Sequence, residues 1–120
     1  MSESVSPPDP PALAGLRVLD LSRVLAGPLC TAVLGDLGAE VIKVERPVHG
    51  DDTRQWGPPW AEGSAGREAA YYLAVNRNKR SIEVDLKKEA GRARVRELAR
   101  GAVVVVENFA PGTMDGWGLG

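Results

Sequence analysis

The sequence is poor in the residues that build metal sites and disulfides. Its 120 residues include one cysteine, Cys30, and one histidine, His49. A single cysteine excludes an internal disulfide, and no cysteine–histidine cluster has the spacing of zinc ligands. A Ser-His-Asp triad would need His49, which is followed by glycine in a loop where an exposed side chain is expected. We therefore expect no metal site.

The sequence also lacks a surplus of charge of either sign and a long apolar run. Fifteen Lys and Arg residues against sixteen Asp and Glu residues give a formal net charge of −1. Because nucleic acid binding needs an excess of basic residues on one face, nucleic acid is not an expected partner. No apolar run, that of residues 102–106 included, approaches the roughly 18 residues of a membrane-spanning helix, so no membrane insertion is expected.

The first 12 residues form a short, acidic, proline-rich segment. This segment has neither the basic and apolar regions of a secretory signal nor the arginines of a transit peptide. We expect residues 1–12 to be a disordered leader, and the protein to be cytoplasmic. A hydrophobic fraction of 43% and a charged fraction of 26% indicate one globular unit in residues 13–120.

Most of this unit alternates between patterns typical of strands and of helices. Strands are predicted over residues 17–21, 40–45, 80–85 and 102–106, and helices over residues 28–37, 69–75 and 87–100. Gly38 stands where the end of a helix takes the left-handed conformation. Because strands alternate with helices, the predicted fold class is α/β, a Rossmann-like open parallel sheet with flanking helices.

Side-chain patterns predict three further details of this fold. Strand 102–106 is wholly apolar, which is typical of the buried centre of a parallel sheet. Residues 46–68 lack a regular pattern and are expected to form a long irregular loop. In helix 87–100, three residues are expected to face inward: Ala90, Ala93 and Leu98.

The loop after the first strand lacks the glycine pattern of dinucleotide-binding proteins. Residues 22–28 read Ser-Arg-Val-Leu-Ala-Gly-Pro, with one glycine where G-x-G-x-x-G has three. The chain also has no G-x-x-x-x-G-K-[ST] loop. We therefore expect neither NAD nor a nucleoside triphosphate as ligand.

Basic and amide residues at strand ends suggest an anion site. Arg46 follows the second strand, at the carboxyl edge where open α/β sheets bind ligands, and a guanidinium can hold a phosphate with two hydrogen bonds. Four residues near the third strand would complete the site: Asn76, Asn78, Lys79 and Arg80. Alternatively, Arg46 and Lys79 are ordinary solvated charges.

Other polar and aromatic residues are explained as well by structure as by chemistry. Asp20 lies inside a strand, either partnered near the sheet edge or as a hydrogen-bond acceptor. Asp51 and Asp52 are typical of turns, and Cys30 is typical of a small core residue. Four aromatic residues could line a pocket or fix the long loop: Trp56, Trp60, Tyr71 and Tyr72. These residues alone do not identify an enzyme.

Four segments, in their order and spacing, resemble one enzyme family. They are Leu19-Asp-Leu-Ser-Arg-Val-Leu-Ala-Gly-Pro28, Leu34-Gly-Asp-Leu-Gly-Ala-Glu-Val-Ile-Lys-Val-Glu-Arg-Pro47, Asn76-Arg-Asn-Lys-Arg-Ser-Ile82 and Val106-Glu-Asn-Phe-Ala-Pro-Gly112. Together they resemble the start of the class III CoA-transferases, the family of formyl-CoA transferase and α-methylacyl-CoA racemase. Residues 50–59 are most similar to the branch that contains succinyl-CoA:glutarate CoA-transferase.

The resemblance implies a site for CoA or an acyl-CoA, bound as a substrate and not as a permanent cofactor. It implies that Val24, Leu25 and Ala26 of the first loop contact the nucleotide and that Arg46 binds its phosphates. It also implies that Val84 and Lys87 flank the adenine and ribose, and that Asn108 and Phe109 border the pantetheine path. Two positions depart from the pattern of formyl-CoA transferase: Arg23 stands in place of a histidine, and Gly116 stands in place of a basic residue.

The resemblance further implies transfer of CoA from an acyl-CoA to a carboxylic acid, a dicarboxylate in this branch, through an aspartyl intermediate. Since the aspartate lies beyond Gly120, no catalytic residue is expected here. Residues 13–120 are then the N-terminal part of an incomplete large domain, inactive alone. The full-length protein is expected to be an interlocked homodimer. The alternatives are an acyl-CoA racemase of the same family and a stand-alone CoA-binding module without catalysis.

Overall fold

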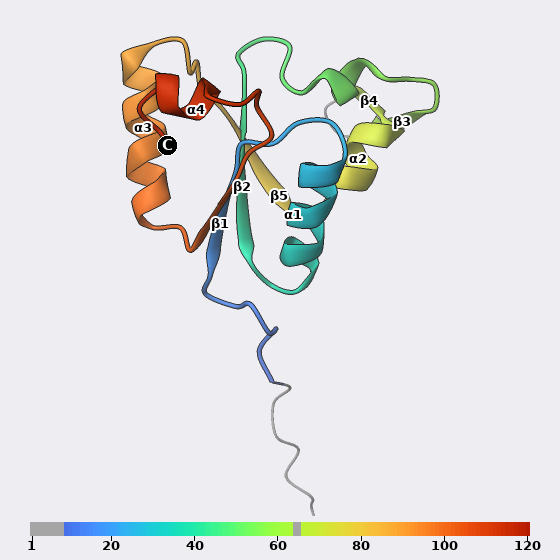
Figure 1. Cartoon of the computed structure of the whole chain (residues 1–120). Helices are drawn as coiled ribbons and strands as arrows, with labels where there is room; N and C mark the ends of the chain where they lie inside the picture. Colours follow the sequence, from blue (N-terminus) through green and yellow to red (C-terminus); the bar gives the residue numbers. More distant parts are fainter. Residues whose placement is uncertain (1–8, 64–65) are drawn as a thin grey trace, which may run out of the picture.

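The computed structural model describes residues 9–63 and 66–120. At its centre is a four-stranded sheet of β1 (Arg17–Asp20), β2 (Glu40–Glu45), β5 (Lys79–Glu83) and β6 (Val104–Val106) (Figure 1). All strand pairs are parallel, and the spatial order is β5-β2-β1-β6. The chain therefore adds β2 and β5 on one side of β1, and then returns to add β6 on the other side. This reversal creates a crevice between the carboxyl ends of β1 and β6.

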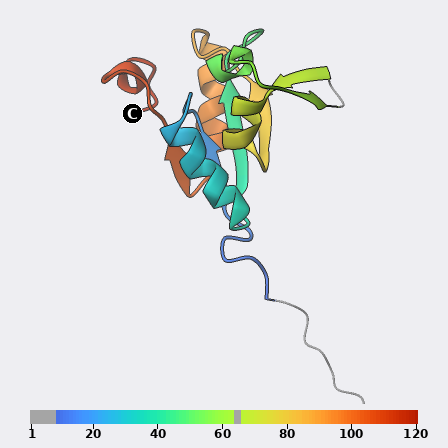
Figure 2. The same ribbon diagram turned by 90° about the vertical axis from the view of Figure 1, so that its right-hand side faces the viewer.

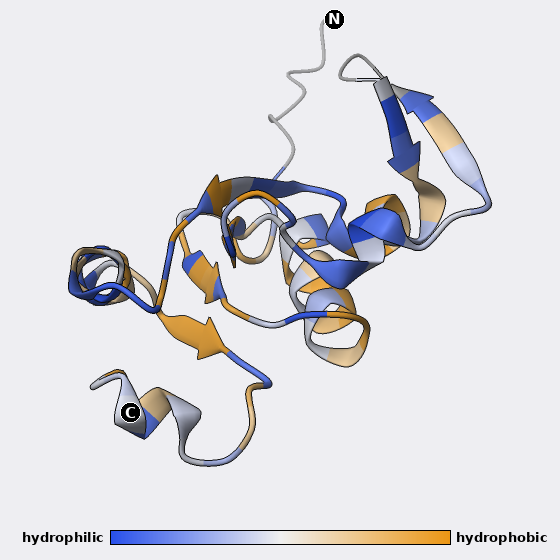
Figure 3. Ribbon diagram, turned by 90° about the horizontal axis from the view of Figure 1, so that it is seen from above, coloured by the Kyte–Doolittle hydropathy of each residue, from blue (hydrophilic) through white to orange (hydrophobic). Residues whose placement is uncertain are grey.

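Helices cover both faces of the sheet, which confirms the predicted α/β class. Helices α1 (Ala26–Asp36) and α2 (Ala70–Asn76) lie on one face, and α3 (Glu89–Arg100) lies on the other (Figures 1 and 3). A short helix, α4 (Thr113–Gly116), follows β6. Helix α1 ends at Asp36, and Gly38 just beyond its cap Leu37 has the expected left-handed conformation, with a φ of +105° that glycine adopts without strain.

The core lies on both faces of the two central strands. Leu19 of β1 and Ile42 of β2 belong to a cluster with Val95 of α3, whereas Val18 and Val41 face α1. The expectation for α3 is wrong in part, because Ala90 and Ala93 are exposed and Leu98 is half-buried. Val95 is the buried residue of this helix, and the 3.6-residue period places Leu98 and Ala99 on its side.

Strand β6 is not at the centre of the sheet, contrary to its apolar composition. It pairs with β1 alone among the described residues and forms one edge of the sheet (Figure 3). Val104 is 43% and Val105 is 42% exposed. The two central positions are taken by β1 and β2, so β6 has no second neighbouring strand among the described residues.

The segment over residues 46–68 is more regular than predicted. It contains a 3₁₀ turn, η1 (Asp52–Gln55), and the first strand of an antiparallel pair, β3 (Trp60–Gly63) with β4 (Gly66–Ala69), which projects from the body (Figure 2). Trp56 packs edge-on against Tyr71 with ring centroids 5.3 Å apart, and the guanidinium of Arg67 lies over Trp60 at 4.3 Å. These contacts favour the interpretation that the aromatic residues fix the segment.

The chain ahead of β1 is described only in part. Residues 1–8 of the expected leader lie outside the described residues, so the structure does not test their disorder. Leu13 donates its N–H to the carbonyl of Leu37, which attaches the segment to the end of α1. In the described ranges, no helix is long and apolar enough to cross a membrane, and no group of three or more potential ligands could hold a metal ion.

Candidate CoA site

A cavity of about 220 Å³ lies at the carboxyl edge of the sheet. It is lined by residues that follow all four parallel strands: Leu21, Ser22 and Arg23 after β1, Arg46, Gly50 and Asp51 after β2, Val84 to Lys87 after β5, and Phe109 after β6. Open α/β sheets bind ligands at this edge, because loops from neighbouring parallel strands converge there.

Four of the eight residues predicted to contact CoA line this cavity: Arg46, Val84, Lys87 and Phe109. The other four lie on the loops beside it. Leu25, which caps α1, and Ala26, its first residue, are exposed. Val24 is half-buried, and Asn108 is exposed next to Phe109. The structure thus brings all eight to one edge of the sheet but places Val24, Leu25, Ala26 and Asn108 outside the cavity wall.

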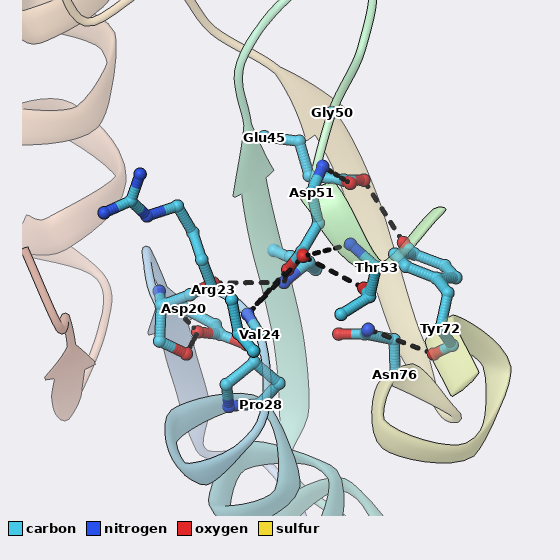
Figure 4. Close-up of polar contacts among 12 residues, drawn as sticks. Asp20, Arg23, Val24, Pro28, Glu45, Gly50, Asp51, Thr53, Tyr72 and Asn76 are labelled. Carbon is cyan, nitrogen blue, oxygen red and sulfur yellow. Dashed lines mark hydrogen bonds and ion pairs between the residues drawn. The ribbon is translucent and has the colours of Figure 1, made fainter. Parts of the chain in front are cut away.

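The loop after β1 is held in an unusual backbone conformation. Val24 has a φ of +74°, a left-handed conformation that is costly for a β-branched residue. Its N–H donates to the carboxylate of Asp51, with nitrogen–oxygen distances of 3.3 and 3.4 Å (Figure 4). The loop after β2 therefore helps to fix the shape of the loop after β1.

Asp51 forms a fully buried ion pair with Lys43. The Lys43 Nζ atom lies 2.9 Å from Asp51 Oδ2, and the two side chains are 1% and 0% exposed. Lys43 also donates to the carbonyl of Ser22, and Asp51 accepts from the backbone and the hydroxyl of Thr53. Burial raises the pKa of Asp51, but the hydrogen bonds from Thr53 and Lys43 outweigh it and keep the pKa below its ordinary value.

A second buried pair anchors the start of the same loop. Lys79 Nζ lies 2.9 Å from Asp20 Oδ2, and Asp20 also accepts from the hydroxyls of Ser22 and Thr31. Burial raises the pKa of Asp20, but Lys79 and the two hydroxyls together hold it below its ordinary value. Asp20 is thus a structural hydrogen-bond acceptor, which was one of the two expected roles.

Glu45 at the end of β2 fixes the segment that leads away from the cavity. It receives two hydrogen bonds from Arg54, at 2.8 and 2.6 Å, and others from Ser81 and Tyr72. Burial raises the pKa of Glu45, but the hydrogen bonds from Arg54 and Ser81 lower it to about 2. This carboxylate therefore stays charged and fully engaged with protein groups.

The predicted anion site does not form as a unit. Strand β5 runs parallel to β2, so Lys79 at its start lies opposite Val41 and not beside Arg46 at the carboxyl end. Lys79 is buried against Asp20, so it is not a solvated charge either. The other three residues of the predicted site also have partners elsewhere. Asn76 donates to the carbonyl of Tyr72, Asn78 donates to Asp36, and Arg80 lies 4.0 Å from the carboxylate of Glu40. Of the predicted set, Arg46 alone lines the cavity.

The remaining candidates have mixed outcomes. Asp51 caps the turn η1 as expected of a turn former, and Asp52 is half-exposed and pairs with Arg46. His49 is exposed, in agreement with its loop position. The interpretation of Cys30 as a core residue is wrong, because the outer side of α1 is uncovered in the described chain and Cys30 lies on it.

Sequence reasoning missed Lys43 and the cavity residue Trp117. Lys43 reads as the exposed residue of an alternating strand, yet β2 is central and has five consecutive buried residues. A lysine inside a strand that helices flank on both faces needs a buried carboxylate. The Gly-Asp-Asp sequence that follows β2 was the available signal for that partner.

Comparison with known proteins identifies the family of this chain. Residues 13–120 match the family described as CoA-transferase family III, so the chain belongs to that family. Succinyl-CoA:glutarate CoA-transferase of Homo sapiens is 57% identical over 108 residues, which cover 90% of this chain and 24% of that protein. Succinate–glutarate CoA-transferase of Agrobacterium fabrum is 55% identical over 111 residues, covering 91% of this chain and 28% of that protein.

A solved structure supports the same assignment. A CaiB/BaiF family protein from Brucella suis superposes with a TM-score of 0.88 and 52% identity, covering 93% of this chain and 29% of that one. The resemblance inferred from the four sequence segments is therefore confirmed. The chain spans about a quarter of the length of the curated relatives that it matches.

Proposed function

We propose that this chain supplies the CoA-binding half of a CoA-transferase. The observation that carries the proposal is the cavity at the carboxyl edge, with Arg23, Arg46 and Lys87 in its wall. Its buried acids, Glu45 and Asp51, are neutralised by Arg54 and Lys43. Arg46 pairs with Asp52, and Asp85 is a third acid of the wall, so Arg23 and Lys87 together leave a small excess of positive charge that suits the phosphates of CoA.

Each loop has a definite task in this proposal. Arg46, oriented by the carbonyl of Gly50 and by Asp52, binds phosphate. Val84 and Lys87 flank the adenine and ribose, and Phe109 with Asn108 borders the pantetheine path. Val24, Leu25 and Ala26 meet the nucleotide from the first loop, which the Lys43–Asp51 pair keeps in shape. Residues 13–120 then form the N-terminal part of the large domain, after a leader of residues 1–12.

The chemistry is proposed to take place on residues outside this sequence. An aspartate attacks the acyl-CoA thioester and releases CoA as the thiolate, which leaves an acyl–aspartyl anhydride. The thiolate then attacks the aspartyl carbonyl of this anhydride, so that the donor acid leaves and an aspartyl-CoA thioester forms. The acceptor carboxylate displaces the thiolate from this thioester, and attack of the thiolate on the acceptor carbonyl of the second anhydride gives the new acyl-CoA and restores the aspartate. Within the described residues, each buried carboxylate is already held by a cation. None of Asp20, Glu45 and Asp51 is therefore free to act as this nucleophile. CoA and the acyl group enter and leave as substrates.

A dicarboxylate is the proposed acceptor, because relatives named for succinate and glutarate share more than half of their aligned residues with this chain. The full-length protein, incubated with succinyl-CoA and glutarate, is expected to form glutaryl-CoA, measured by mass spectrometry. Epimerisation of a 2-methylacyl-CoA without transfer would favour the racemase alternative. CoA binding without either reaction would leave a binding module.

The proposal includes a homodimer of interlocked chains in the cytoplasm. An exposed apolar stripe on the outer side of α1 supports the presence of a further polypeptide surface that covers this helix. The stripe consists of Leu25, Leu29, Val33 and Leu37, each 43–46% exposed. Sedimentation equilibrium of the protein from its native host would measure the number of chains, and cell fractionation would test the location.

A further inference from the structure

Arg23 is the first residue of the loop after β1 whose side chain leaves the buried interior. Its side chain lines the cavity, and Figure 4 shows its guanidinium pointing away from Asp51 and Asp20. The residue lies at the crevice where the strand order reverses between β1 and β6. In open α/β sheets this crevice is the position where ligands bind.

Contacts with the loop after β6 hold Arg23 in place. Asn108 accepts a hydrogen bond from the Arg23 N–H at 2.9 Å and donates its amide to the Arg23 carbonyl at 2.7 Å. The guanidinium carbon lies 4.8 Å from the centroid of the Phe109 ring. Phe109 is in turn supported edge-on by Trp117, with ring centroids 5.2 Å apart. The cation is therefore positioned before any ligand arrives, which reduces the entropy cost of binding.

No carboxylate neutralises this cation among the residues that the structure describes. Arg46, its neighbour in the cavity wall, shares its charge with Asp52. Of the acids in the wall, Glu45 and Asp51 are bound to other cations, whereas Asp85 accepts from the Lys87 N–H and forms no ion pair with Arg23 in the described ranges. A guanidinium that stacks by its face on an aromatic ring keeps its N–H groups free at its edge, in the geometry that suits a phosphate.

We propose that Arg23 binds a phosphate group of CoA, supported by Phe109 and held by Asn108. This inference rests on the proposed function and adds a phosphate-binding residue in the first loop, beside the predicted CoA contacts Val24, Leu25 and Ala26. CoA offers two sources of phosphate, the diphosphate and the 3′-phosphate, and both have the same chemistry towards a guanidinium.

Calorimetry on the full-length protein tests this inference with Arg23→Gln and a matched control, Arg94→Gln. Arg94 is an exposed residue of α3 that does not line the cavity. Arg23→Gln keeps the main-chain bonds to Asn108, so the fold is expected to persist, and thermal melting would verify it. We expect Arg23→Gln to weaken CoA binding roughly tenfold or more. Arg94→Gln is expected to change the Kd less than about twofold.

Binding of 3′-dephospho-CoA distinguishes the two phosphates. If Arg23 binds the 3′-phosphate, the substitution weakens CoA but not dephospho-CoA; if it binds the diphosphate, it weakens both equally. Equal affinity of the wild type and Arg23→Gln for CoA would overturn the assignment of Arg23 alone. Failure of the wild-type protein to bind CoA would overturn the proposed function together with this inference.

Discussion

Replacing one member of the buried Lys43–Asp51 pair is expected to destabilise the fold far more than replacing the adjacent exposed acid. Asp51→Asn retains an oxygen that accepts from Thr53 but leaves the Lys43 ammonium buried without a counter-charge. Both side chains are at most 1% exposed, so water cannot compensate. Removal of one partner of such a pair costs about 3–5 kcal/mol of unfolding free energy.

The adjacent acid provides a matched control. Asp52 pairs with Arg46, but both side chains are 54% exposed. An exposed pair of this kind contributes about 0–1 kcal/mol, so Asp52→Asn is expected to change the free energy of unfolding within that range. Urea unfolding of the full-length protein, followed by tryptophan fluorescence, would measure both variants. The comparison is valid if the denaturant slope stays constant.

A double substitution completes the test. Lys43→Met with Asp51→Asn removes both charges, so the double variant is expected to be less destabilised than the sum of the two single variants by about 1–3 kcal/mol. Strictly additive effects, or an Asp51→Asn variant as stable as Asp52→Asn, would refute the conclusion that this pair holds the loops together.

Three further predictions follow from single sites. The folded pKa of Glu45 is about 2 against an ordinary 4.5, so the carboxylate contributes stability that is complete above the higher value. A loss of about 3 kcal/mol is expected as the pH falls between these values, and Glu45→Gln should flatten that part of the pH profile. Gly38→Ala is expected to cost about 1–2 kcal/mol, because φ is +105° and the new Cβ would lie 2.3 Å from Pro11 Cβ. Thermal melting would measure this loss, and an unchanged melting temperature of Gly38→Ala would contradict the prediction. Arg46→Gln is expected to raise the Kd for CoA roughly tenfold, measured by calorimetry, whereas an unchanged Kd would remove Arg46 from the phosphate site.

The features that local patterns determine were predictable from the sequence. Strand β2 was predicted over its observed residues, and Gly38 ends the first helix as expected, because both depend on a few neighbouring residues. The α/β class followed from the alternation of elements. Arg46 was predicted from its place after the second strand and, together with Val84, Lys87 and Phe109, from the family resemblance. All four line the cavity, and their contact with CoA stays a prediction.

Features that depend on distant residues were not predictable in this way. The apolar strand β6 lies at an edge because strand order is a property of the whole sheet. The burial of Lys43 depends on Asp51 and on the central position of β2, neither of which alternation reveals. The anion site failed for the same reason, because Lys79 and Arg46 are brought to opposite ends of paired strands by the parallel register.

Hydrogen exchange with and without CoA tests the central claim most directly. On the full-length protein, CoA is expected to protect amides in residues 21–26, 44–51, 84–87 and 107–109, which converge at the carboxyl edge of the sheet. Residues 66–69 of the projecting hairpin serve as the internal control and should exchange at the same rate in both states. Protection confined to other segments, or none at saturating CoA, would contradict the location of the CoA site at this edge.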